Sequence, residues 1–393
     1  MHVPRAFRLL IPLALTAGLA CAAPRVPDSD QQVLETLPVR PADPRMAQVN
    51  ALRLELRRHP DDVATAVALA RRYYELVAAE GDPRFVGQAQ SALAPWWDRP
   101  DPPPAVRVMR AVLLQFGHRF DEAVADLSAV VRSEPGNAQA WAWLAAIHLV
   151  QADYAEARVA CGRLAPHTTP LLATTCAAHV DSLTGQAARA SQAIRAALRD
   201  APAADAEARL WTLTRLAEID ERRGDHAAAE AAFRDALSLG LTDGYLLAAY
   251  ADFLLDRGRA GEVLTLLKEH GRSDVLLLRL ALAARLLNAP GAAAFERDMA
   301  ARFDAARLRG DATHQKEEAR FALGVQNQPQ RSLPLAADNF AVQREPADAR
   351  ILLEAALAAR RPDAAAPALQ WMAASRIESV VLHGLATRLE ALR

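Results

Sequence analysis

The sequence has little lysine, little cysteine and few aromatic residues. Lys268 and Lys316 are its only lysines, and aromatic residues make up 5% of the 393 positions although hydrophobic residues make up 52%. Alanine supplies much of the hydrophobic content, which favours helices packed through small side chains over a core of large rings. The formal net charge of −1 lacks the basic excess of nucleic-acid-binding proteins, so we expect no nucleic-acid partner.

Catalytic and cofactor-binding motifs are also missing. The sequence holds no HExxH, CxxC, GxSxG or GxxxxGK[ST] pattern. Acidic pairs at helical spacing, such as Glu218 with Glu221, are more typical of a solvated helix face than of an acid/base pair. We therefore predict no enzyme activity and no cofactor.

The N-terminal residues have the pattern of a secretory signal peptide. Arg5 and Arg8 precede an apolar run at residues 9–20, and small residues follow. The run is too short for a confident transmembrane helix. We predict a signal peptide at residues 1–22 with cleavage after Ala22, and an exported protein that is periplasmic or associated with the cell envelope.

Cys21 gives an alternative to simple cleavage. Bacterial lipoproteins carry an acylated cysteine after a short lipobox, usually with leucine three positions earlier, where this sequence has Gly18. Acylation of Cys21 would tether the chain to a membrane, whereas cleavage after Ala22 would release it. A membrane contact is expected only through Cys21. Residues 23–45 are rich in proline, aspartate and arginine and are predicted to form a flexible linker.

A repeated helical pattern is the strongest signal in the chain. Five segments each follow a turn and place a small or medium residue at one position, with a larger residue four positions later. The small positions are Ala123, Ala157, Ala190, Ala229 and Val263, at spacings of 34, 33, 39 and 34 residues. A further small residue lies twelve positions upstream of each, in a preceding helix. Small side chains at both positions let two antiparallel helices approach closely.

This pattern resembles the tetratricopeptide repeat, a helix–turn–helix unit of about 34 residues. The best match has family residues at Trp141, Leu144, Ala145, Tyr154, Ala157 and Leu164. The resemblance implies an all-α fold, a right-handed α-solenoid of stacked antiparallel helix pairs over residues 46–393, with a concave groove and a C-terminal capping helix at 377–392.

The resemblance also implies where a partner binds. In this family, peptide ligands are usually contacted by outward positions of the first helix of each repeat. The corresponding residues are Thr175, His179, Trp211, Glu218, Tyr245 and Asp252. The function implied is a non-enzymatic protein–protein interaction scaffold of the bacterial cell envelope, which binds a segment of a protein or peptide partner in its groove.

Cys161 and Cys176 leave three interpretations open. The repeat register places them on neighbouring helices of successive repeats, close enough for a disulfide in an oxidising compartment. They are equally compatible with two buried free thiols. The third interpretation is an alternative function, a metal- or redox-handling protein that uses both cysteines with nearby His148, His167 and His179. Because the spacing matches no compact ligand motif, we predict no metal.

Overall fold

The computed structural model describes residues 44–80, 84–310 and 313–392. The contacts divide the chain after Ala47, and Gln48–Arg393 form one compact unit. In the described part of the chain, regular structure is helical throughout and contains no strand. The predicted signal peptide, Cys21 and nearly all of the predicted linker lie outside the described residues. None of the described helices is both long and apolar enough to cross a membrane.

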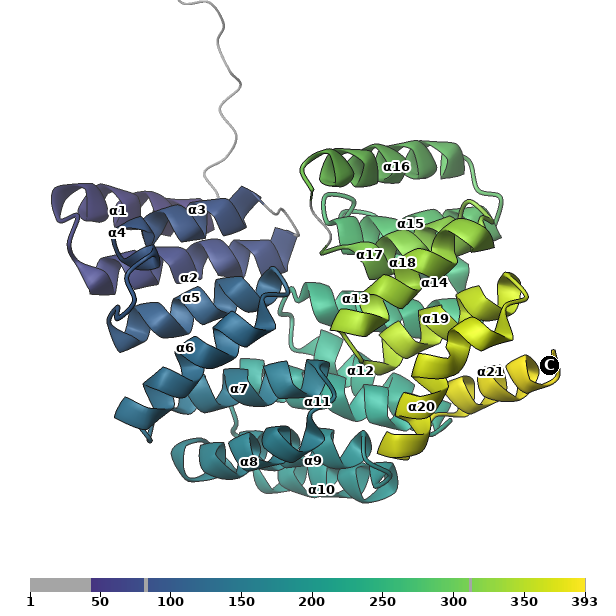
Figure 1. Cartoon of the computed structure of the whole chain (residues 1–393), viewed down its shortest axis with the longest axis horizontal. Coiled ribbons are helices and arrows are strands. Elements are labelled where there is room, and N and C mark those ends of the chain that lie inside the picture. Colours follow the sequence, from purple (N-terminus) through teal and green to yellow (C-terminus); the bar gives the residue numbers. More distant parts are fainter. Residues whose placement is uncertain (1–43, 81–83, 311–312, 393) are drawn as a thin grey trace, which may run out of the picture. The chain divides into compact units, whose positions relative to one another are not determined.

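Helices follow one another along the chain as antiparallel pairs (Figure 1). The first half contains α1 (Pro44–Arg58), α2 (Val63–Glu80), α3 (Arg84–Ala92), α4 (Ala94–Trp97), α5 (Pro104–Phe116), α6 (Phe120–Ser133), α7 (Ala138–Val150), α8 (Tyr154–Leu164), α9 (Pro170–Ser182), α10 (Ala187–Asp200), α11 (Ala206–Arg222) and α12 (His226–Ser238). The second half contains α13 (Gly244–Asp256), α14 (Ala260–Leu267), α15 (Asp274–Leu286), α16 (Ala292–Leu308), α17 (Gln315–Gly324), α18 (Pro329–Val342), α19 (Pro346–Ala358), α20 (Ala366–Ser375) and α21 (Val380–Glu390). Short 3₁₀ helices lie at Ala165–His167 and Pro362–Ala365.

Contacts between successive pairs make this arrangement a solenoid. Helix α5 packs on α6, α7 on α8, α9 on α10 and α11 on α12, and the second helix of each pair packs on the first helix of the next. The first helices of successive pairs also contact one another: α9 contacts α11, and α11 contacts α13. The stacked helix pairs confirm the predicted all-α solenoid.

Small residues occupy the helix crossings, as the repeated pattern predicts. The ten crossing positions are buried: Ala111, Ala123, Ala145, Ala157, Ala178, Ala190, Ala217, Ala229, Ala251 and Val263. Side-chain caps fix where several helices begin. The Asp153 carboxylate accepts a hydrogen bond from the Glu156 amide at the start of α8, and Asp205, Asp225 and Asp243 act in the same way at α11, α12 and α13.

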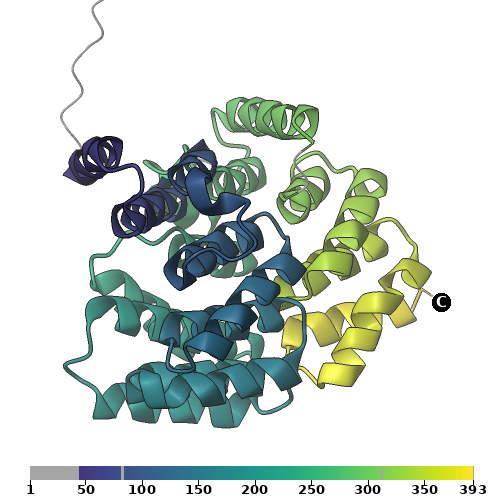
Figure 2. The same cartoon turned by 60° about the vertical axis from the view of Figure 1, so that its left-hand side comes forward.

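The C-terminal helices pack against the first half of the solenoid. In Figure 2 the yellow C-terminal helices lie next to blue helices from the first half. The Trp371 indole nitrogen donates a hydrogen bond to the Tyr154 hydroxyl at 3.0 Å, 217 positions earlier in the chain. The Arg344 amide donates to the Val150 carbonyl at 2.8 Å. The C-terminal end of the array therefore contacts its first half.

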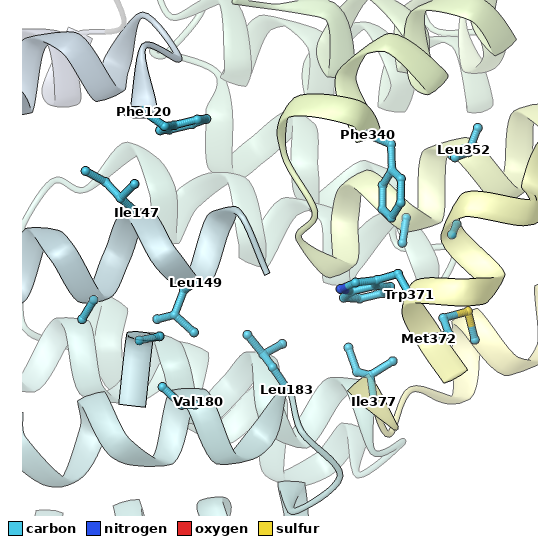
Figure 3. Close-up of a cluster of buried hydrophobic side chains, with 14 of the residues drawn as sticks. Phe120, Ile147, Leu149, Val180, Leu183, Phe340, Leu352, Trp371, Met372 and Ile377 are labelled. Atoms are coloured by element: carbon cyan, nitrogen blue, oxygen red, sulfur yellow. The ribbon is translucent and has the colours of Figure 1, made fainter. Parts of the chain in front are cut away.

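One hydrophobic cluster spans this contact. Figure 3 shows Leu149, Val180 and Leu183 of the first half on one side and Trp371, Met372 and Ile377 of the C-terminal helices on the other, and all belong to a single buried cluster. Burial of apolar surface at about 25 cal/mol per Å² is the main force that holds such contacts together.

Two glycines allow the loops to approach the C-terminal helices. Gly185 has a φ of 79°, and a Cβ atom there would lie 3.1 Å from the Arg376 carbonyl oxygen. Gly224 has a φ of 83°, and its Cβ atom would lie 3.3 Å from a Val380 methyl carbon. Positive φ and close contact both favour glycine at these positions.

Candidate functional site

A pocket of about 550 Å³ lies among the first helices of the pairs. Side chains from α2, α5, α7, α9, α11, α13, α15, α17, α19 and α21 line it. These helices come from both ends of the solenoid, because the C-terminal pairs return to the first half. The volume is within the range of pockets that hold small molecules or a few side chains of a partner.

Four of the six residues predicted to contact a partner line this pocket. They are His179 of α9, Glu218 of α11, and Tyr245 and Asp252 of α13. The repeat register brings them together because each lies on the side of its pair's first helix that faces the pocket. Tyr245 is 52% exposed, so its ring presents a large surface to a ligand.

The other two predicted residues do not line the pocket. Thr175 is fully buried, and its hydroxyl bonds the Leu171 carbonyl at 2.8 Å and the Thr212 hydroxyl at 3.0 Å. Trp211 is partly buried and packs against the hydrophobic cluster that joins the two ends of the array. Both residues therefore stabilise the packing between repeats, and a partner contact at Thr175 does not fit its burial.

Glu218, Tyr245 and Arg215 form a bonded unit on the pocket wall. The Tyr245 hydroxyl donates to a Glu218 carboxylate oxygen at 2.5 Å, and an Arg215 guanidinium nitrogen lies 3.0 Å from the other oxygen. The Arg215 guanidinium also stacks over the Tyr245 ring, 4.5 Å from its centre. These contacts hold the aromatic ring in one orientation toward the pocket.

Asp252 is held between two arginines. Arg279 donates two hydrogen bonds to its carboxylate, at 3.0 and 2.7 Å, and a nitrogen of Arg320 lies 2.7 Å away. Burial alone would raise the pKa of Asp252, but the two guanidinium groups outweigh it and hold that pKa well below its usual value. Asp252 therefore stays ionised and is already neutralised by the protein, which leaves it little charge to offer a partner.

Sequence reasoning missed the part of the wall that comes from α17 and α19. Lys316 pairs with Asp348 at 3.3 Å, and Arg350 donates to Asp256 at 2.6 and 2.7 Å. Burial would lower the pKa of Lys316, but the Asp348 carboxylate raises it instead. These side chains lie far from α11 and α13 in the sequence, so no local pattern places them at the same site.

Two neighbouring residues of α11 have no ion-pair partner in the described residues. The sequence pattern had given Glu221 as a solvated surface residue, but it lines the pocket. Burial, followed by the nearby Asp256 and Glu218 carboxylates, raises the pKa of Glu221 to about 8. Arg222 has no carboxylate within 4 Å, and burial lowers its pKa. The shifted pKa values of Glu221 and Arg222 mark the C-terminal end of α11 as a candidate functional site.

Cys161 and Cys176 are joined by a disulfide, with their Cα atoms 5.6 Å apart. It connects α8 to α9 and thus links two successive repeats. The described residues contain no group of three or more histidine, cysteine, aspartate or glutamate side chains placed to hold a metal ion. His148 lies 3.4 Å from Asp153, and His179 lines the pocket.

Comparison with known proteins gives a family for part of the chain. Residues 117–170 match the family model of the tetratricopeptide repeat. No curated protein matches the sequence.

Several solved structures are similar in fold. The APC/C hetero-tetramer Cut9-Hcn1 matches at 12% identity and a TM-score of 0.42, over 79% of this chain and 52% of the other, so this chain spans about half the length of that relative. A tetratricopeptide repeat protein from Parabacteroides merdae ATCC 43184 is 13% identical, with a TM-score of 0.35 over 74% and 98% of the two chains. The human IFIT1 dimer with m7Gppp-AAAA is 12% identical, with a TM-score of 0.43 over 88% and 86%. At these values the similarities say nothing of what this chain binds.

Proposed function

We propose that this chain, which carries a tetratricopeptide repeat at residues 117–170, is a non-enzymatic scaffold for protein–protein contacts. Its partner is a protein or peptide that inserts a short segment into the pocket among the first helices. Stacked helix pairs suit this role because they hold a binding surface rigid with little change of shape.

A single observation supports the pocket as the binding site. His179, Glu218, Tyr245 and Asp252 belong to three different helices of the solenoid, yet they line the same cavity. Tyr245 offers a half-exposed aromatic ring held by Glu218 and Arg215. Rigid aromatic anchors at the centre of a binding surface contribute a large share of binding energy in many interfaces. The volume of about 550 Å³ limits the inserted segment to a few residues.

Export to the bacterial cell envelope is the second part of the proposal. The basic residues and apolar run of positions 5–20 support a signal peptide. The disulfide between Cys161 and Cys176 also favours an oxidising compartment, since cytosolic thiols are usually kept reduced. Mass spectrometry of the mature N-terminus would test this part, and an N-terminus at Met1 would contradict it. Release after Ala22 and acylation of Cys21 give different masses.

The binding proposal is tested by crosslinking the full chain in cells and identifying captured proteins by mass spectrometry. Tyr245→Ala removes the ring, and Glu218→Arg reverses a charge on the pocket wall. Each is expected to lower recovery of the specific partner by about tenfold, since interface anchors are worth about 1–3 kcal/mol. Asp235→Arg is the matched control, because Asp235 is exposed on α12 and lies outside the pocket. Unchanged helicity by circular dichroism shows that the fold is intact, and equal recovery with all variants would contradict the pocket as the site.

A further inference from the structure

Almost all the cations of the pocket wall have a carboxylate partner in the protein itself, although Arg279 and Arg320 share that of Asp252. Six arginine and lysine side chains line the pocket. Five of them have a carboxylate within 4 Å: Arg215, Arg279, Lys316, Arg320 and Arg350. Arg222 is the exception in the described part of the chain. A charge removed from water without a partner is costly, so Arg222 is the position on this wall where a negative group gains most.

The surroundings of Arg222 leave hydrogen-bonding capacity unused. One terminal nitrogen donates to the Ser182 hydroxyl at 2.9 Å. The Nε atom is buried and has no hydrogen-bond partner, and the Nε atom of neighbouring Arg215 is in the same state. Arg215 is itself only 9% exposed. A buried donor without an acceptor costs free energy, and an acceptor oxygen that reached it would recover that cost.

The nearby histidine adds no positive charge and no competing negative charge. Burial, with Arg215 and Arg222 close by, lowers the pKa of His179 well below its usual value. Its imidazole is therefore neutral at pH 7 and is able to donate or accept one hydrogen bond beside Arg222.

Three pocket carboxylates have no ion pair within 4 Å in the described residues, those of Glu221, Glu317 and Glu345. Burial raises the pKa of Glu345, which favours its neutral form. Glu221 is mostly protonated at pH 7, because its pKa is raised to about 8. Burial would raise the pKa of Glu317, but Lys316, His314 and Arg279 outweigh it and hold that pKa low. The charge of Glu317 is thus balanced by cations of α15 and α17. Arg222 belongs to α11 and is not one of these cations.

Apolar side chains line the same pocket as Arg222. Leu149 and Leu183 belong to its wall although they are largely buried. Phe116 of α5 and Tyr74 of α2 line it too and are only partly buried. A ligand whose negative group reaches Arg222 would therefore find apolar side chains in the same pocket.

We propose that the partner segment presents a glutamate or aspartate side chain flanked by apolar residues, and that this carboxylate pairs with Arg222 while its neighbours contact the apolar side chains that line the same pocket. The inference rests on the proposed function, because it specifies the chemistry of the segment that enters the same pocket. Charge complementarity at Arg222 is what selects an acidic residue over a basic or neutral one.

The test uses the full chain and a bead library of hexapeptides with six random positions. The peptides are acetylated at the N-terminus and joined to the bead through the C-terminus, so that side chains supply every charge. The wild-type chain is expected to select peptides with an acidic residue next to leucine, isoleucine or phenylalanine. A selected peptide made in solution should bind about tenfold or more tightly than its version with glutamine in place of glutamate, because hydrogen bonds between charged groups are the strong ones.

Variants assign the selectivity to Arg222. Arg222→Gln should remove the preference for glutamate over glutamine, and Arg222→Lys should keep part of it. Arg223→Gln is the matched control, since Arg223 is the next residue, is exposed, and pairs with Asp220 outside the pocket. Circular dichroism checks that each variant is folded.

The outcomes separate this inference from the proposed function. If the selected peptides show no acidic preference, or if Arg222→Gln keeps it, the inference is overturned even when Tyr245→Ala still loses the partner. If free decanoate binds and no capped peptide does, the pocket holds a small carboxylic acid, and the inference is again overturned. Failure of the proposed function itself would show as equal capture by the Tyr245→Ala chain and the wild type.

Discussion

Arg350 of α19 binds Asp256 of α13 through two hydrogen bonds of 2.6 and 2.7 Å, across 94 positions of sequence. The two side chains are 32% and 19% exposed, so the pair is partly removed from water. Arg350 also donates to Glu354 of its own helix at 2.7 Å, which holds the guanidinium in place. The pair joins the returning C-terminal repeats to the middle of the solenoid.

Loss of this pair should weaken the contact between the C-terminal repeats and the middle of the solenoid. We expect Arg350→Met to lower the free energy of unfolding by about 1–3 kcal/mol, less than for a fully buried pair because both groups retain some solvent. Arg361→Gln is the control, since both side chains of its pair with Asp363 are exposed and its effect should be much smaller. Urea denaturation of both variants measures the difference, and equal losses would show that the pair does not hold this contact.

The disulfide should stabilise the joint between α8 and α9. Cys161 and Cys176 close a loop of 15 positions, which corresponds to about 3 kcal/mol in the chain-entropy model. A reductant should therefore lower the urea midpoint of the wild-type chain and leave the Cys161→Ala/Cys176→Ala double variant unchanged. Thiol counting on unfolded, unreduced protein checks the bond directly, and free thiols at both positions would refute it.

Replacing the small residue Ala157 at a helix crossing by a larger one should destabilise the protein. Ala157 is fully buried where α8 meets α7, so Ala157→Leu must displace neighbouring side chains. We expect a loss of about 1–3 kcal/mol, as for other overpacked cores. Val159 lies two positions further along α8 and is 52% exposed, so Val159→Leu should change stability by less than about 0.5 kcal/mol. Thermal or urea unfolding compares the two, and similar effects would contradict close packing at Ala157.

The alanine register was readable from the sequence because it is local. Ala145 and Ala157 recur at fixed spacing, and close helix packing demands small residues there whatever follows in the chain. Four of the predicted partner-binding residues reached the pocket for the same reason, since the register fixes which helix face points inward. The same rule misplaced Thr175, because Thr212 of the next repeat covers it.

The contact between the C-terminal helices and the first half could not be predicted from the sequence, because it depends on residues far apart in the chain. Nothing near Tyr154 signals that Trp371 will bond its hydroxyl, and nothing near Asp256 signals Arg350. Among the described residues, the lack of a carboxylate within 4 Å of Arg222 also depends on how distant segments pack around the pocket. Charge pairs between distant segments form only in the folded state, and no repeated sequence pattern predicts them.

Glu221 makes the stability of the protein depend on pH in a particular direction. Burial and the nearby Asp256 and Glu218 carboxylates raise its pKa from 4.5 to about 8 in the folded protein. Between these values the folded protein keeps a proton that the unfolded chain has released, so the free energy of unfolding falls as pH rises. The contribution of Glu221 is complete below about pH 4.5 and lost above about pH 8.

Glu221→Gln should remove this dependence, because glutamine stays neutral at every pH. We expect the variant and the wild type to be equally stable near pH 4, and the variant to be more stable by roughly 1–3 kcal/mol at pH 9, less than the full shift implies because solvent screens the group in part. Glu207→Gln is the control, since Glu207 is exposed in the first turn of the same helix. Urea denaturation at pH 4, 6, 7, 8 and 9 gives the curves. Parallel curves for Glu221→Gln and wild type would mean that Glu221 is already ionised in the folded protein at neutral pH, and Arg222 would then have a negative neighbour that competes with any ligand carboxylate.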